Sequence, residues 1–91
     1  MPVRFHNDER AYAAWMRAHP NGFVFNHFGG GDPAYNVVHR ANCSTLRRGA
    51  DTGARTHVEK VCGVKREEVE AAASAMRDGP CGWRHCGICM R

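Results

Sequence analysis

The chain has 91 residues and a formal net charge of +4, and it contains five cysteines and six histidines. No apolar run approaches the roughly 18 to 20 residues that a membrane-spanning helix needs, so we expect no membrane partner. The odd number of cysteines and a polar first segment argue against a secreted disulfide scaffold and favour a cytoplasmic location. A domain this small buries a thin core, and a bound metal is a common additional source of stability.

Arginine supplies 11 of the 13 basic residues. The planar guanidinium group pairs well with phosphate, so this composition raises the expectation of a nucleic-acid partner, DNA or RNA. Such phosphate contacts give affinity without a choice of base sequence.

The first expected element is a helix from about Asp8 to His19. Asn7 and Asp8 can cap its N-terminus, and the Pro-Asn-Gly segment at 20–22 stops it. Residues at helical spacing form one face, which we expect to pack on the rest of the domain. The alternative is that this face stacks bases or docks on a partner. Its members are Tyr12, Trp15, Met16 and His19.

A β-hairpin is expected next. Residues 23–28 are rich in β-forming side chains, residues 29–33 form a glycine-rich turn, and residues 34–38 return as the second strand. This hairpin delivers His39 into a tight turn that ends at Cys43. Residues 47–55 are basic and contain little to bury, which indicates a flexible loop, and residues 56–61 are a candidate third strand.

The last expected element is a helix over residues 65–77. Val69, Ala73 and Met76 lie on one face of it, acidic residues lie in its first turn, and Gly79 follows its end. Together these elements predict an α+β fold in one domain over residues 1–91. We expect a β-hairpin or short antiparallel sheet with an N-terminal helix and a C-terminal helix.

Two pairs of residues have the spacing of metal ligands. His39 and Cys43 form an H-x3-C pair, and Cys86 and Cys89 form a C-x2-C pair near the other end of the chain. Three thiolates and one imidazole suit tetrahedral Zn²⁺, and each pair can reach one ion from a single tight turn. The four residues therefore predict a zinc site that ties the hairpin to the C-terminal segment and stabilises the domain.

Two further cysteines leave the fourth ligand open. Cys81, five residues before Cys86, can replace His39 to give a four-cysteine site, and Cys62 is a weaker substitute.

The order of these features resembles the Ada-type metal-binding domain. The resemblance rests on the strand that begins at Phe23, the hairpin, the segment His39-Arg40-Ala41-Asn42-Cys43, the helix that ends before Gly79, and residues 82–89, Gly-Trp-Arg-His-Cys-Gly-Ile-Cys. It covers residues 22–91 as an Ada-like zinc-binding module and leaves residues 1–21 as an N-terminal helical extension.

In that family four thiolates hold zinc, and the first of them accepts a methyl group from DNA. His39 stands at this position here, and an imidazole is no equivalent methyl acceptor. The three-thiolate site also carries less negative charge, which leaves each sulfur less nucleophilic. We therefore expect no catalytic residue, and methyl-accepting DNA repair is the least favoured function.

The favoured function is a structural zinc domain in a nucleic-acid-binding accessory or regulatory protein. The alternative is a protein–protein interaction module that uses the aromatic N-terminal helix. Trp83 is a candidate to cover the zinc or to stack on a base. The candidate phosphate-binding residues are Arg40, Arg47, Arg48, Arg55 and Arg84.

Overall fold

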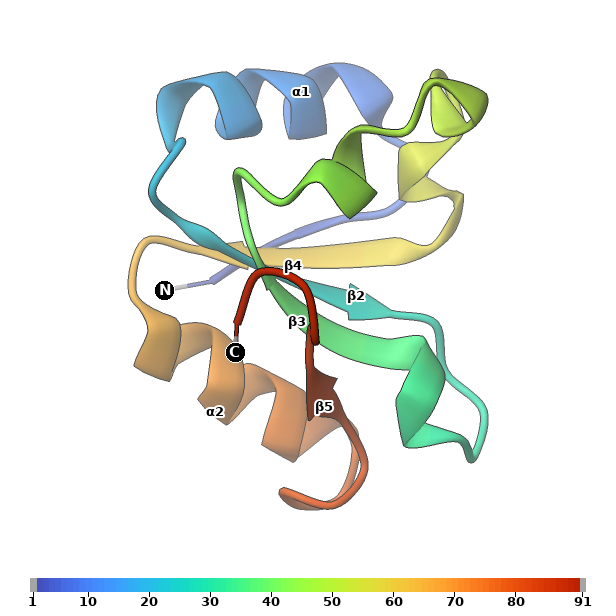
Figure 1. Cartoon of the computed structure of the whole chain (residues 1–91), viewed down its shortest axis with the longest axis vertical. Helices are drawn as coiled ribbons and strands as arrows, with labels where there is room; N and C mark the ends of the chain where they lie inside the picture. The colour runs from blue at the N-terminus through green and yellow to red at the C-terminus, as the bar shows by residue number, and fades with distance from the viewer. Residues whose placement is uncertain (1, 91) are drawn as a thin grey trace.

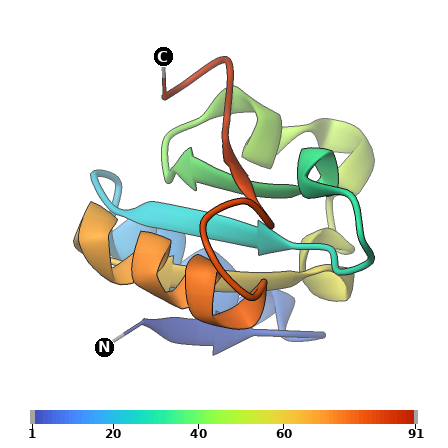
Figure 2. The same ribbon diagram turned by 90° about the horizontal axis from the view of Figure 1, so that it is seen from below.

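The computed structural model describes residues 2–90 as a five-stranded mixed sheet between two α-helices (Figure 1). The sheet order is β1-β4-β2-β3-β5, with the parallel pair β3–β5 at one edge and antiparallel pairs elsewhere. Figure 2 shows β1 and the C-terminal segment at opposite edges of the sheet. The elements are β1 (Val3–Phe5), α1 (Glu9–Ala18), β2 (Phe23–His27), β3 (Asn36–Arg40), β4 (Glu59–Gly63), α2 (Arg66–Met76) and β5 (Arg84–His85).

Each face of the sheet has its own hydrophobic core. Strand residues alternate between the faces, so Val24 packs toward α1 whereas its neighbour Phe25 packs toward α2. The α1 core also contains Tyr12 and Met16, and the α2 core contains Val69 and Ala73 with strand residues Val38 and Val61. The expected α+β class is thus confirmed, as a compact two-helix fold around a mixed sheet.

Both expected helices are present. The Asp8 side chain accepts a hydrogen bond of 3.2 Å from the Ala11 N–H and caps α1. Tyr12 and Met16 on α1 are buried, and Trp15 is partly buried against the same core, so most of this face packs on the sheet as expected. Residues 2–21 contribute β1 and these buried side chains to the same core as the rest of the described chain.

The strands differ from the expectation in their bounds and number. β3 begins at Asn36 because Asp32 caps a short 3-10 helix, Pro33–Tyr35, and it runs on to Arg40. His39 therefore lies within a strand, paired with Val24, and not in the turn that follows. A further 3-10 helix, Arg55–His57, precedes the third expected strand, β4, which therefore begins only at Glu59.

Two strands were not expected from the sequence. β1 has three residues and β5 has two, which are too short for a recognisable alternation of apolar side chains. The expected β-hairpin is present as β2–β3, but the parallel strand β5 makes the sheet mixed, so the alternative expectation of a short antiparallel sheet is wrong.

Residues 47–54 of the basic segment are exposed, Arg55 is half-buried, and the segment contains a short 3-10 helix, Gly49–Asp51. Its end is attached to α1, because the Glu9 carboxylate accepts a hydrogen bond of 2.7 Å from the Arg55 N–H and further hydrogen bonds from Thr56. Neither helix within residues 2–90 has the length and apolar character needed to cross a membrane.

Candidate metal centre

The parallel pairing of β3 with β5 brings the two ligand pairs together. Val38 is in register with His85, and the Cys86 N–H donates a hydrogen bond of 2.9 Å to the Val38 carbonyl. The residue after Val38 is His39, so it lies beside Cys86. Cys43 follows in the turn after β3, and Cys89 in the turn after β5. The sheet thus joins residues that are far apart in the chain.

The ligand atoms of His39, Cys43, Cys86 and Cys89 all lie within 4.8 Å of one another. The sulfurs of Cys43 and Cys86 are 3.9 Å apart. Two sulfurs bound to one tetrahedral zinc at about 2.3 Å are about 3.8 Å apart, whereas a disulfide bond is about 2.05 Å long. All three cysteines are free thiols, so the cluster has the dimensions of a metal site.

Backbone N–H groups point at two of the sulfurs. The Arg40 N–H donates to Cys89 Sγ at 3.2 Å, and the Ile88 N–H donates to Cys86 Sγ at 3.4 Å. The Met90 N–H donates to the Cys86 carbonyl at 3.1 Å and closes the C-terminal turn. Hydrogen bonds to a thiolate favour the charged form, which is the form that binds metal.

The protonation of the cluster suits a cation. Burial, together with the positive charges of Lys60, Arg84 and Arg48, lowers the pKa of His39 to about 4, so the imidazole is neutral at pH 7. Burial alone would raise the pKa of Cys86, but hydrogen bonds from Cys89, Ile88 and Cys43 lower it. Burial, with the nearby sulfurs of Cys43 and Cys86, raises the pKa of Cys89 to about 12. A divalent cation among the sulfurs offsets this cost of ionising them together.

No family model matches the chain, and no curated protein or solved structure matches it. By its own geometry, the site is a group of one histidine and three cysteines that can hold a metal such as zinc.

The alternative ligands lie elsewhere in the part of the chain described. Cys81 is exposed and is not one of the four clustered residues. Cys62 lies in β4 opposite Val24, inside the α1 core, and burial raises the pKa of its thiol to about 12. Cys62 has the surroundings of an inert core thiol.

The candidate phosphate-binding arginines are divided between the two faces of the sheet. Arg40 lies over the Phe23 ring at 5.7 Å and donates from Nε to the Cys89 carbonyl at 2.9 Å. Phe23 belongs to the α2 side. Arg48 and Arg55 line a pocket on the other face. Arg47 donates to the Ala41 carbonyl at 3.4 Å, and Arg84 donates to the carbonyls of Ala34 and His85.

Trp83 does not cover the metal cluster. Its ring packs with the α2 core, and its indole N–H donates to the Ser74 hydroxyl at 2.9 Å. Cys43 and Cys86 belong to the core on the opposite face, so the expectation that Trp83 covers the zinc is wrong.

Sequence reasoning missed Lys60, which is buried in β4 and lines the same pocket as His39. The available signal was its position two residues before Cys62, a weaker candidate ligand. Side chains two apart on a strand share a face, so this spacing places Lys60 on the same face as that cysteine. The pairing of Lys60 with Asn26 in β2 depends on the strand register, which the sequence does not display.

Thr45 offers a test of the ligand positions. Its hydroxyl lies 3.0 Å from Cys43 Sγ and 3.3 Å from His39 Nδ1, so it forms hydrogen bonds with two of the four ligands and orients them. We expect Thr45→Val to weaken zinc binding about tenfold or more, as for other groups that orient metal ligands. A competition titration with a chromophoric chelator measures this, and Thr52→Val in the exposed loop is the matched control. Equal zinc affinity of the two variants would show that Thr45 does not orient the ligands.

Proposed function

We propose that the chain is a structural zinc domain that binds nucleic acid. The zinc assignment is supported by the clustered imidazole and three thiols, of which His39, Cys43 and Cys86 are buried. A catalytic zinc keeps one position open for water or substrate, whereas four protein ligands complete a tetrahedral shell. The complete set of four donors is the observation on which this proposal rests, and it favours a binding role over chemistry at the metal.

The resemblance to the Ada-type domain supports the same role. The order of hairpin, ligand pair, helix and C-x2-C pair is similar, and His39 stands where that family has its methyl-accepting thiol. We propose that the metal here is retained for folding alone. No mass increase of the intact protein is expected after incubation with methylphosphotriester DNA, and an added methyl group would contradict this view.

Nucleic acid is the proposed partner because the largely exposed segment 47–55 presents arginines beside a buried lysine. Arg48, Arg55 and Lys60 line one pocket together with a single carboxylate, Asp51. Phosphate contacts from such a surface provide affinity that falls with salt concentration.

The binding test compares a labelled 20-nucleotide single strand with the corresponding duplex by fluorescence anisotropy at several salt concentrations. We expect the double variant Arg47→Ala/Arg48→Ala to bind at least tenfold more weakly at low salt. Each lost phosphate contact lowers the slope of the logarithm of the binding constant against the logarithm of the salt concentration by about one, so the loss of affinity is largest at low salt. The control is Arg10→Ala/Lys65→Ala, which removes the same charge from other exposed sites. Affinity weaker than millimolar for both nucleic acids at low salt would refute the proposal.

A further inference from the structure

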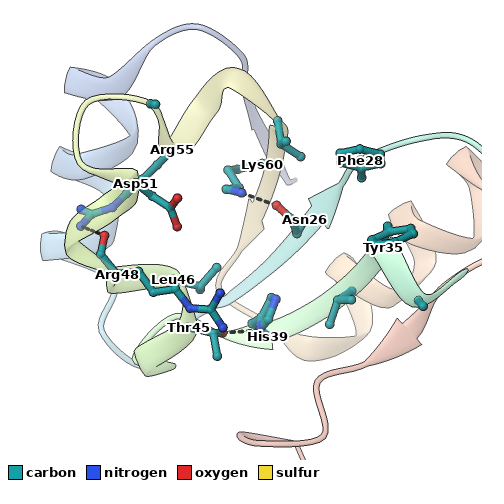
Figure 3. Close-up of a pocket in the computed structure, with 14 residues that line it drawn as sticks. Asn26, Phe28, Tyr35, His39, Thr45, Leu46, Arg48, Asp51, Arg55 and Lys60 are labelled. Atoms are coloured by element: carbon teal, nitrogen blue, oxygen red, sulfur yellow. Dashed lines mark hydrogen bonds between the residues drawn. The ribbon is translucent and has the colours of Figure 1, made fainter.

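A pocket of about 390 Å³ lies between the segment 45–58 and the β2–β3 connection (Figure 3). Its floor is the sheet face opposite α2, where Asn26 is in register with Lys60 on one side and Val37 on the other. The volume is within the range of about 300 to 1,000 Å³ that is typical of small-molecule sites. We call this cavity, lined by Asn26, Phe28, Tyr35, His39, Arg48 and Lys60 among others, the loop pocket.

Lys60 gives the floor of the loop pocket an incompletely paired charge. Its side chain is 8% exposed, and it donates a hydrogen bond to Asn26 Oδ1. Within residues 2–90 no carboxylate forms an ion pair with it. An ammonium group has three donors, and a buried charge without an ion-pair partner is costly. The charge of Asp51, the one carboxylate in the lining, acts on Lys60 without forming an ion pair, so an anion in the loop pocket would add the direct partner.

The wall formed by the segment 45–58 adds further positive charge. Figure 3 shows the Arg48 side chain extended toward His39, on the same side of the loop pocket as Asp51 and Arg55. Arg55 Nη2 donates to the Arg48 carbonyl at 3.4 Å, and Arg55 Nε is buried without a hydrogen-bond partner in the described part of the chain. With Lys60 there are three cations against the one carboxylate of Asp51, so the lining attracts anions.

The opposite wall of the loop pocket is aromatic. Phe28 and Tyr35 are 60% and 58% exposed, and their ring centroids are 5.5 Å apart. The buried Asn36 side chain fixes the loop that bears them, because its amide accepts from the Gly29 N–H and donates to the carbonyls of Gly29 and Asp32. Exposed rings on a fixed loop are a surface on which a flat heterocycle can stack.

We propose that the loop pocket binds one nucleotide unit, with the phosphate between Lys60 and Arg48 and the base against Phe28 and Tyr35. The cationic and aromatic walls face each other, as the two ends of a nucleotide require (Figure 3). Where the nucleotide belongs to a nucleic-acid strand, this inference rests on the proposed function. It favours a single strand over a duplex, because a paired base is not free to stack on protein.

The test uses the purified protein with its metal and 2′-deoxyadenosine 5′-monophosphate as the probe, measured by calorimetry and amide chemical shifts. We expect the monophosphate to bind at least tenfold more tightly than deoxyadenosine or inorganic phosphate, because each of these lacks one half of the ligand. Lys60→Met and Tyr35→Ala should each weaken binding by at least about fivefold. Lys65→Met, at an exposed position before α2, is the matched control and should bind as the wild type.

Oligonucleotides separate this inference from the proposed function. Tighter binding of a single strand than a duplex, with the same losses in Lys60→Met and Tyr35→Ala, supports both. Binding of strands that is unaffected by these two variants overturns the loop pocket and leaves nucleic-acid binding in place. Binding of the monophosphate without binding of any strand supports the loop pocket and refutes the proposed function. Failure of the monophosphate to bind, or binding by both variants that is as tight as by the wild type, overturns the inference.

Discussion

Removal of zinc by a chelator is expected to unfold the domain. The cluster links β3 to the C-terminal segment. The strand that pairs this segment with β3 is β5, which has two residues and little stability of its own. Structural zinc contributes on the order of 10 kcal/mol to small zinc domains, and the whole stability of a domain is typically about 5 to 15 kcal/mol. Without the metal little net stability remains.

Circular dichroism and two-dimensional NMR during titration with a chelator measure this effect. We expect native helix signal and amide dispersion to be lost together and to return when zinc is added. Cys86→Ala should behave as the chelated protein does, whereas Cys81→Ser, at an exposed cysteine outside the cluster, should behave as the wild type. A chelated protein with an unchanged unfolding midpoint would show that the metal is not structural.

Phe25→Ala is expected to have the largest effect among substitutions away from the metal. Phe25 is fully buried in the centre of the sheet, between Val38 on β3 and Val61 on β4, and it packs toward α2. Replacing a buried phenylalanine with alanine costs about 3 to 5 kcal/mol, because packing is lost and a cavity remains. In a domain of this size that loss lowers the melting temperature by more than about 10 °C.

Phe28→Ala is the matched control for this substitution. Phe28 has the same side chain and lies one residue beyond the end of β2, but it is exposed. We expect its thermal midpoint to change by no more than a few degrees, since exposed substitutions are usually within about 0.5 kcal/mol of neutral. Similar midpoints for the two variants in thermal denaturation would contradict the assignment of Phe25 to the core.

The parts of the fold that the sequence predicts are those with a local signal. Asp8 and the spacing of Tyr12 and Met16 define α1, and the aromatic residues of 23–27 with the glycines that follow define the hairpin. β5 has no such signal, because it is a strand only through its parallel pairing with β3. Tertiary context therefore determines both the mixed sheet and the position of His39 within a strand.

The same division applies to the two candidate sites. The metal cluster was predicted because H-x3-C and C-x2-C spacings are local patterns with a chemical meaning. The loop pocket combines residues of β2, β3, β4 and the segment 45–58, and no spacing in the chain relates Lys60 to Tyr35 or Arg48. Strand register brings these residues together, so only the structure could reveal the loop pocket.

The zinc content of purified variants, measured by mass spectrometry after dialysis against a competing chelator, decides which residues bind the metal. We expect one zinc ion per chain in the wild type and in Cys81→Ser, and a large loss of zinc in His39→Ala. Full retention of zinc by His39→Ala, or its loss from Cys81→Ser, would contradict the assignment of His39, Cys43, Cys86 and Cys89 as the ligands.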